Sequence, residues 1–201
     1  PFFFAKREHL FLKKKLINSI SKSLLHGKTL QGPEVSKLEN LIIKYTGKKY
    51  AVAVGSCTDA LFFSLKALGI KRGDEVIVTS YSYLASATCI LRCEAKPVFI
   101  DVDKNGNMLL DEVEKKITKK TRAIIYVHLF GYMQNIDKLK KITKNRKLYL
   151  IEDFAQALGA QNKTKKAGSI GDISCTSFDP TKVLSAPGSG GMAFTNDKKI
   201  K

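Results

Sequence analysis

The spacing of apolar residues changes part-way along the chain. From Glu8 to about Leu25, leucines and isoleucines recur near helical spacing among lysines and serines, which predicts an amphipathic helix ending at His26 and Gly27. A second helix is expected in KTLQGPEVSKLENLIIKYTG, where a Gly-Pro turn precedes apolar residues at helical offsets. After Gly47 the helical period ends.

Beyond this point short apolar runs alternate with helical stretches. The predicted strands, in chain order, are AVAV, DEVIVTS, PVFIDVD, AIIYVHLF, LYLIED, DISCTSF and GMAFTND. Strands separated by helices are typical of parallel pairing in a sheet covered on both faces. We therefore expect an α/β fold, a three-layer α/β/α domain with a mostly parallel central sheet over residues 31–201. An N-terminal helical segment, residues 1–30, would precede it.

Composition narrows the partners that the chain could bind. The chain has 201 residues, 44% of them hydrophobic, which is enough for one sizeable core. A net charge of +17 would suit nucleic acid, a membrane face or a phosphorylated small molecule. However, only five of the 35 basic residues are arginine, the residue favoured for contacts with bases and phosphates. No apolar run is long enough to span a bilayer. We predict that neither nucleic acid nor a membrane is a partner.

The cysteines and histidines suggest no metal centre. Cys57, Cys89, Cys93 and Cys175 form no CxxC pair, so we expect buried, reduced thiols and a cytoplasmic protein. Cys89 and Cys93 would share a helix face but lack a second pair of ligands. His128, at a strand end, is left without a function and is expected to be a packed core histidine.

The ends of the chain suggest that it continues. It begins at Pro1 without a methionine and stops at Lys201, just after the predicted strand GMAFTND. The opening PFFF is too short for the apolar core of a signal peptide. We expect further residues to follow.

Ligands of parallel sheets gather at the carboxyl ends of the strands, so the residues that follow each strand are the candidates for a site. After AVAV come Gly55, Ser56, Cys57 and Thr58, which precede a predicted helix. The free N–H groups of a helix start, together with small hydroxyl residues, suit a phosphate group. Ordinary N-capping by Ser56 or Thr58 explains the same residues equally well.

Two further strand ends carry polar or aromatic residues. Asp153 ends LYLIED, and Gln156 follows three residues later. A carboxylate at the end of a buried strand needs a cation or several donors, and a protonated ring nitrogen would serve. Alternatively, Asp153 caps a following helix. Tyr81 and Tyr83 come just past DEVIVTS, where an aromatic face could cover a flat cofactor or simply pack against the protein.

The stretch SFDPTKVLSAPGSGG supplies the last element of the candidate site. Ser177 ends the strand DISCTSF, and Lys182 lies in the turn beyond it. A phosphate cradle, an aromatic cover, a buried carboxylate and a lysine are together the parts needed to hold pyridoxal 5′-phosphate (PLP).

Eight ordered blocks strengthen this interpretation. GPEVSKLE, GSCTDAL, GDEVIVTSYSYLASA, KPVFIDVD, AIIYVHLFG, IEDFAQALGA, GSIGDISCTSF and SFDPTKVLSAPGSGG resemble successive blocks of the DegT/DnrJ/EryC1/StrS aminotransferases, over about Gly27 to Asp197. These are sugar aminotransferases of the aspartate-aminotransferase (type I) fold. The resemblance implies that the chain is the large domain of such an enzyme, truncated before the smaller C-terminal domain.

The resemblance also implies roles for individual residues. Lys182 matches the catalytic lysine that condenses with the aldehyde of PLP and, once released, moves a proton between carbon centres. Asp153 matches the catalytic acid that pairs with the pyridine nitrogen.

The remaining cofactor-binding positions follow in the same way. Gln156 matches the residue near the phenolic oxygen of the cofactor, and Tyr83 the aromatic residue that stacks on its ring. Thr58, the backbone of Cys57, and Ser177 match the positions that hold the phosphate.

By resemblance the reaction is a two-stage transamination. An amino donor, most often glutamate in this family, leaves its nitrogen on the cofactor, and a nucleotide-linked keto-sugar takes it up. The product would serve a polysaccharide, glycan or antibiotic pathway, and the site would form within a homodimer.

Several positions depart from the family pattern. Cys57 stands where glycine is usual, Asp179 where an aromatic residue or histidine is common, and Val183 where asparagine is common. A dehydratase branch has histidine in place of the lysine, and Lys182 argues against it. The alternative from a different class is a truncated or degenerate protein that binds cofactor or partners without turnover.

Overall fold

The computed structural model describes residues 6–134, 136–163 and 165–200. Within them, one sheet of seven strands has the order β1-β9-β8-β5-β4-β2-β3. Its strands are β1 (Tyr50–Val54), β2 (Glu75–Thr79), β3 (Lys96–Ile100), β4 (Thr121–Val127), β5 (Tyr149–Asp153), β8 (Ile173–Ser177) and β9 (Gly191–Thr195). Each of the seven runs predicted from the sequence therefore forms a strand.

The sheet is mostly parallel, as predicted, and its exception is β9. Strands β3, β2, β4, β5 and β8 pair in parallel, whereas β9 runs antiparallel between β8 and β1. A parallel neighbour needs a crossover connection, usually a helix, and the segment 178–190 between β8 and β9 contains none. The chain therefore turns back, and this returning segment carries Lys182.

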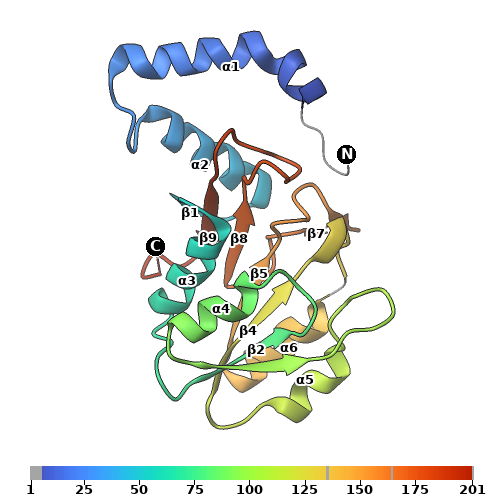
Figure 1. Cartoon of the computed structure of the whole chain (residues 1–201). Helices are drawn as coiled ribbons and strands as arrows, with labels where there is room; N and C mark the ends of the chain where they lie inside the picture. The colour runs from blue at the N-terminus through green and yellow to red at the C-terminus, as the bar shows by residue number, and fades with distance from the viewer. Residues whose placement is uncertain (1–5, 135, 164, 201) are drawn as a thin grey trace.

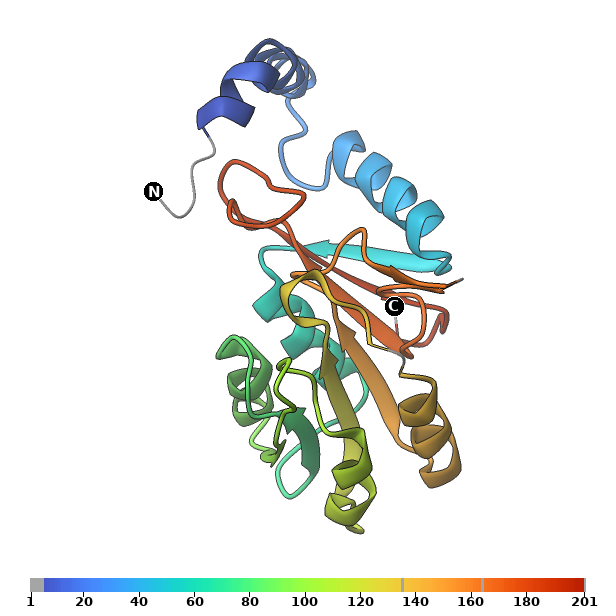
Figure 2. The same cartoon turned by 90° about the vertical axis from the view of Figure 1, so that its right-hand side faces the viewer.

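Helices cover both faces of the sheet, which confirms the three-layer α/β/α prediction (Figure 2). On one face α3 (Cys57–Ala67) and α4 (Ala85–Arg92) pack against a core that includes Leu61, Leu65 and Ile90. The other face is covered by α2 (Pro33–Thr46), α5 (Leu110–Lys116) and α6 (Asp137–Arg146).

The N-terminal helix α1 (Lys6–His26) forms where the apolar spacing predicts it, but it has no buried residue. Figure 1 shows it lying apart from the sheet. Leu24 and Leu25 are 65% and 88% exposed, so its apolar side lacks a covering surface within the described part of the chain. Residues 1–5 of the predicted segment 1–30 lie outside the described residues. Asn135 and Lys201, which belong to the predicted domain 31–201, also lie outside them.

Two small elements were not predicted from the sequence. The segment after β5 forms a short ribbon of β6 (Gln161–Asn162) and β7 (Lys165–Lys166), and a 3-10 turn, η1 (Leu129–Gly131), follows β4. Both are too short to produce a readable hydrophobic period.

Candidate active site

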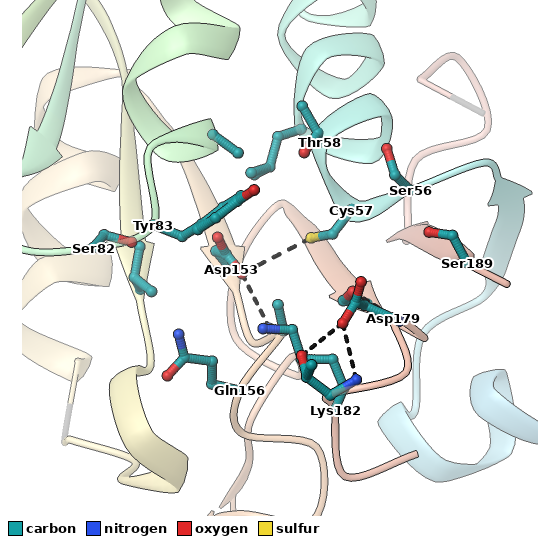
Figure 3. A pocket seen from close by; sticks show the side chains of 16 residues that line it. Ser56, Cys57, Thr58, Ser82, Tyr83, Asp153, Gln156, Asp179, Lys182 and Ser189 are labelled. Atoms are coloured by element: carbon teal, nitrogen blue, oxygen red, sulfur yellow. Dashed lines mark hydrogen bonds between the residues drawn. The ribbon is translucent and has the colours of Figure 1, made fainter. Parts of the chain in front are cut away.

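A cavity of about 290 Å³ opens at the carboxyl ends of the parallel strands. The segments that follow β1, β2, β5 and β8 all reach it, so residues distant in sequence meet there. In the view of Figure 3, Tyr83 and Thr58 lie on one side of the cavity, Gln156 and Lys182 lie on the opposite side, and Asp153 lies between them. Every residue predicted for the site lines this cavity: Cys57, Thr58, Tyr83, Asp153, Gln156, Ser177 and Lys182.

The start of α3 forms one wall of the cavity. Ser56 is the N-cap: its hydroxyl accepts the Asp59 N–H at 3.1 Å and donates to Asp59 Oδ2 at 2.9 Å. Capping therefore explains Ser56, whereas the hydroxyl of Thr58 has no hydrogen-bond partner among the described residues. The first-turn N–H groups and Thr58 are the donors that an anion could use.

Close packing fixes this wall against the sheet. Gly191, the first residue of β9, pairs with Val54 on one side and Ser177 on the other. A Cβ built on Gly191 would lie 2.2 Å from the carbonyl carbon of Ser56 and 2.4 Å from the nitrogen of Cys57. Only glycine lets β9 approach the first turn of α3 so closely.

Asp153 lies at the floor of the cavity and is 6% exposed. Its Oδ1 accepts the Ala155 N–H at 3.0 Å, and Ser86 Oγ lies 3.5 Å from Oδ2. Burial raises the pKa of Asp153, and the Ala155 N–H and the charge of Lys182 offset this only in part. No helix follows in the described chain, where residues 155–159 form turns, so helix capping was the wrong explanation for this carboxylate.

Lys182 is placed by the turn that follows β8. The Asp179 carboxylate accepts the Thr181 N–H at 2.9 Å and the Thr181 hydroxyl at 2.6 Å, and the Lys182 N–H donates to the Asp179 carbonyl at 2.9 Å. These bonds form a compact turn that begins at Asp179. The Lys182 amine has no hydrogen-bond or ion-pair partner among the described residues and remains available to a ligand.

The orientation of the Gln156 side chain is set by a hydrogen bond to the backbone of another loop. Its side-chain oxygen accepts the N–H of Phe130 at 3.0 Å, which leaves the amide nitrogen as the group free to donate. Phe130 has a left-handed backbone, with φ at 53°, an uncommon conformation for a bulky residue.

The two candidate tyrosines differ in position. Tyr83 lines the cavity and is 72% exposed, so it is not a core residue. Tyr81 does not line the cavity and instead meets Phe130 edge to face, with ring centroids 6.2 Å apart. The packing explanation therefore holds for Tyr81 alone.

Sequence reasoning missed Glu152, the neighbour of Asp153. Glu152 is fully buried and accepts hydrogen bonds from His128 Nε2 at 2.9 Å, from the N–H groups of Gly168, Ile170 and Gly171, and from the Ser174 hydroxyl. His128 is a packed core histidine, as predicted.

Ser86 was also missed. It lies in the first turn of α4, 67 residues before Asp153, and no local pattern links the two. The hydroxyl of Ser82, which lines the cavity, lies 2.9 Å from that of Ser86. A chain of two hydroxyl groups thus connects the cavity wall to Asp153.

Comparison with known proteins identifies the family. A sequence model of the DegT/DnrJ/EryC1/StrS aminotransferase family matches residues 11–201. The chain belongs to this family. One curated relative, UDP-2-acetamido-2-deoxy-3-oxo-D-glucuronate aminotransferase of Pseudomonas aeruginosa, is 37% identical over 97% of this chain and 55% of its own length.

Solved structures of similar proteins share the fold. DesV of S. venezuelae, in complex with a ketimine intermediate, superimposes with a TM-score of 0.95 at 35% identity, over 100% of this chain and 54% of its own. NtdA of Bacillus subtilis, with bound cofactor PMP, gives a TM-score of 0.87 at 30% identity, over 93% and 42%. The chain thus spans about half the length of these similar proteins.

The chemistry of the cavity fits PLP, the cofactor of these aminotransferases. A phosphate needs N–H and hydroxyl donors, which the start of α3 and Thr58 supply. A protonated ring nitrogen needs a buried anion, and Asp153 lacks a cationic partner in direct contact among the described residues. Within those residues no group of three or more metal-ligating side chains is found, and no helix has the length and apolarity to cross a bilayer.

Proposed function

We propose that this chain forms the PLP-binding part of an aminotransferase that acts on nucleotide-linked keto-sugars. The amino donor would be glutamate, and the product an amino-sugar nucleotide for a polysaccharide, glycan or antibiotic. The observation that carries the proposal is the meeting, in one cavity, of the Lys182 amine, the buried Asp153 and the start of α3. A cofactor or partner binder without turnover is not favoured, because both catalytic positions are filled by chemically competent residues.

Each residue would contribute a distinct physical task. When bound, PLP supplies a ring that accepts the electron pair released at the substrate carbon. Lys182 Nζ would tether the cofactor and then hold and move a proton. The Asp153 carboxylate would keep the ring nitrogen protonated, because a buried anion favours a cation beside it.

The other cavity residues would orient the cofactor. Thr58, the N–H of Cys57 and the hydroxyl of Ser177 would hold its phosphate, since they are the donors that the α3 and β8 ends present. The amide nitrogen of Gln156 would donate to its phenolic oxygen, and Tyr83 would cover its ring and exclude water.

The organisation of the whole protein is part of the same proposal. We divide the chain into an N-terminal segment, residues 1–30, and a cofactor-binding domain, residues 31–201, a division supported by the absence of buried residues in α1. Its exposed apolar side chains, including Leu10, Ile17 and Leu24, support assembly as a homodimer. The four free, buried cysteines support a cytoplasmic location.

Borohydride trapping tests the proposal. The purified chain is mixed with one equivalent of PLP, reduced with borohydride and digested, and the modified peptides are mapped by mass spectrometry. We expect the cofactor on the peptide that contains Lys182, because its amine lies in a cavity with a phosphate site and an acid.

Two variants serve as controls. Lys182→Arg keeps the charge but cannot condense with an aldehyde, so trapping should be lost. Lys44→Arg changes an exposed lysine of α2 and should leave trapping intact. Modification spread over surface lysines, with none concentrated at Lys182, would overturn the proposal.

A further inference from the structure

Two side chains approach the Asp153 carboxylate from different elements. Cys57 Sγ, in the first turn of α3, lies 3.9 Å from Oδ1, and Ser86 Oγ, in the first turn of α4, lies 3.5 Å from Oδ2. Figure 3 shows the Cys57 thiol pointing toward Asp153. The carboxylate is thus contacted through both of its oxygens.

We propose that Cys57 and Ser86 are positioning residues that hold the Asp153 carboxylate ionised and aimed at the cofactor ring. The inference rests on the proposed function, and it assigns a role to the thiol that stands where the family commonly has glycine. Cys57 would therefore serve the site with its side chain as well as with its backbone.

The physical need for these donors follows from burial. A buried carboxylate is stable as an anion only where donors replace water. Among the described residues, Asp153 receives one backbone donor to its side chain, from Ala155 at 3.0 Å. The thiol and the hydroxyl supply the remaining contacts, and both are long, so each contributes a modest stabilisation.

Burial and the nearby charges keep the Cys57 thiol protonated, and only a protonated thiol can donate a hydrogen bond. Burial raises the pKa of the Cys57 thiol well above its ordinary value, and the charge of Asp153 raises it further. Cys175 and Cys89 act in the same direction, whereas Lys182 opposes them. The thiol consequently acts as a hydrogen-bond donor rather than as a nucleophile.

Alkylation of the cofactor-free chain tests the contact directly. Interaction free energies are reciprocal, so if the Asp153 charge suppresses ionisation of Cys57, removing that charge must promote it. At one fixed, mildly alkaline pH, we expect Asp153→Asn to speed iodoacetamide modification of Cys57 about three- to tenfold, because loss of the Asp153 charge lowers the pKa of the thiol. Peptide mapping reports each cysteine separately.

Matched controls distinguish the loss of the Asp153 charge from a general loosening of the protein. Cys93, 3% exposed in the same core, should react at an unchanged rate in Asp153→Asn. Asp179→Asn removes a second carboxylate of the cavity and should leave Cys57 unchanged. An unaltered Cys57 rate in Asp153→Asn, or equal acceleration of Cys57 and Cys93, would refute the proposal.

Cofactor affinity gives a second readout. Cys57→Ala and Ser86→Ala should each weaken PLP binding about three- to tenfold, because each removes one donor to a buried charge. Cys57→Ser keeps a donor and should retain most of the affinity, whereas Cys93→Ala should change nothing. Equal losses in Cys57→Ala and Cys57→Ser would contradict a donor role. Should the wild-type chain fail to bind PLP, the proposed function fails, while the alkylation result still decides whether the thiol and the acid are coupled.

Discussion

Two adjacent carboxylates at the end of β5 have opposite environments. Glu152 and Asp153 point to opposite faces of the sheet, as neighbours in a strand must, and both are buried. Burial opposes ionisation of Glu152, but His128 and backbone N–H groups outweigh it, and the pKa is lowered. For Asp153 the few donors do not outweigh burial, and the pKa is raised.

The difference separates a structural acid from the acid to which we assign a function. Glu152 ties the loop before β8 to β5 through three backbone N–H groups, so all of its binding capacity is used inside the protein. Asp153 faces a cavity and, among the described residues, has fewer hydrogen-bond donors than Glu152. A buried acid that is short of donors is therefore a better indicator of a ligand site than burial by itself.

The largest expected effect is that of Asp153→Asn on catalysis. The amide keeps the shape but cannot stabilise a cationic ring nitrogen, so the proposed turnover of glutamate and a keto-sugar nucleotide should fall about a thousandfold. The unfolding free energy of the cofactor-free chain should not fall, because an uncompensated buried charge is removed. Steady-state kinetics and urea unfolding measure the two quantities. Retained turnover would refute the functional assignment of Asp153.

Glu152→Gln should show the opposite profile. Removing the charge leaves buried N–H donors poorly satisfied, so the unfolding free energy should fall by about 3 kcal/mol. Since the folded-state pKa of Glu152 is lowered, its stabilisation is present above the ordinary pKa of a glutamate and is lost as pH falls through the folded value.

The pH dependence provides the control for this prediction. Urea unfolding of wild type and variant at a series of acidic pH values should give curves that converge as the pH falls. For Asp153, whose folded-state pKa is raised, the sign is reversed: stability is lost as pH rises through that value. A constant gap between wild type and Glu152→Gln at every pH would show that the charge is unimportant.

The smallest effect concerns two hydroxyl groups of β8. Ser174 Oγ lies 3.4 Å from Glu152 Oε2, whereas the hydroxyl of Thr176 has no partner among the described residues. Ser174→Ala should lower the unfolding free energy by about 1 kcal/mol, because a donor to a buried carboxylate is lost. Thr176→Val removes an unsatisfied group and should be neutral or stabilising. Equal destabilisation by both variants would mean that packing, not hydrogen bonding to Glu152, determines the cost.

The sequence was sufficient to predict the strands and the residues that meet in the cavity. Each predicted residue follows an apolar run, and parallel pairing brings the ends of such runs to one edge of the sheet. Position after a strand made Asp153 and Lys182 candidates, but their roles followed only from the resemblance to the aminotransferase family.

Contacts between distant segments could not be predicted. The donors to Glu152 are mostly backbone groups of residues 168–171, and backbone N–H groups leave no trace in residue type. Ser86 of α4 meets Asp153 of β5 through the packing of a helix on the sheet, across 67 residues of sequence. The place of β9 likewise depends on tertiary pairing, which a strand pattern alone does not specify.

The close packing at Gly191 couples the position of the segment that bears Lys182 to that of the first turn of α3. The segment that bears Lys182 is anchored at one end by Ser177 and at the other by Gly191, and Gly191 presses on the backbone of Ser56 and Cys57. A single added methyl group there would force the segment that bears Lys182 away from the first turn of α3. The distance between the segment that bears Lys182 and the start of α3 thus depends on a residue without a side chain.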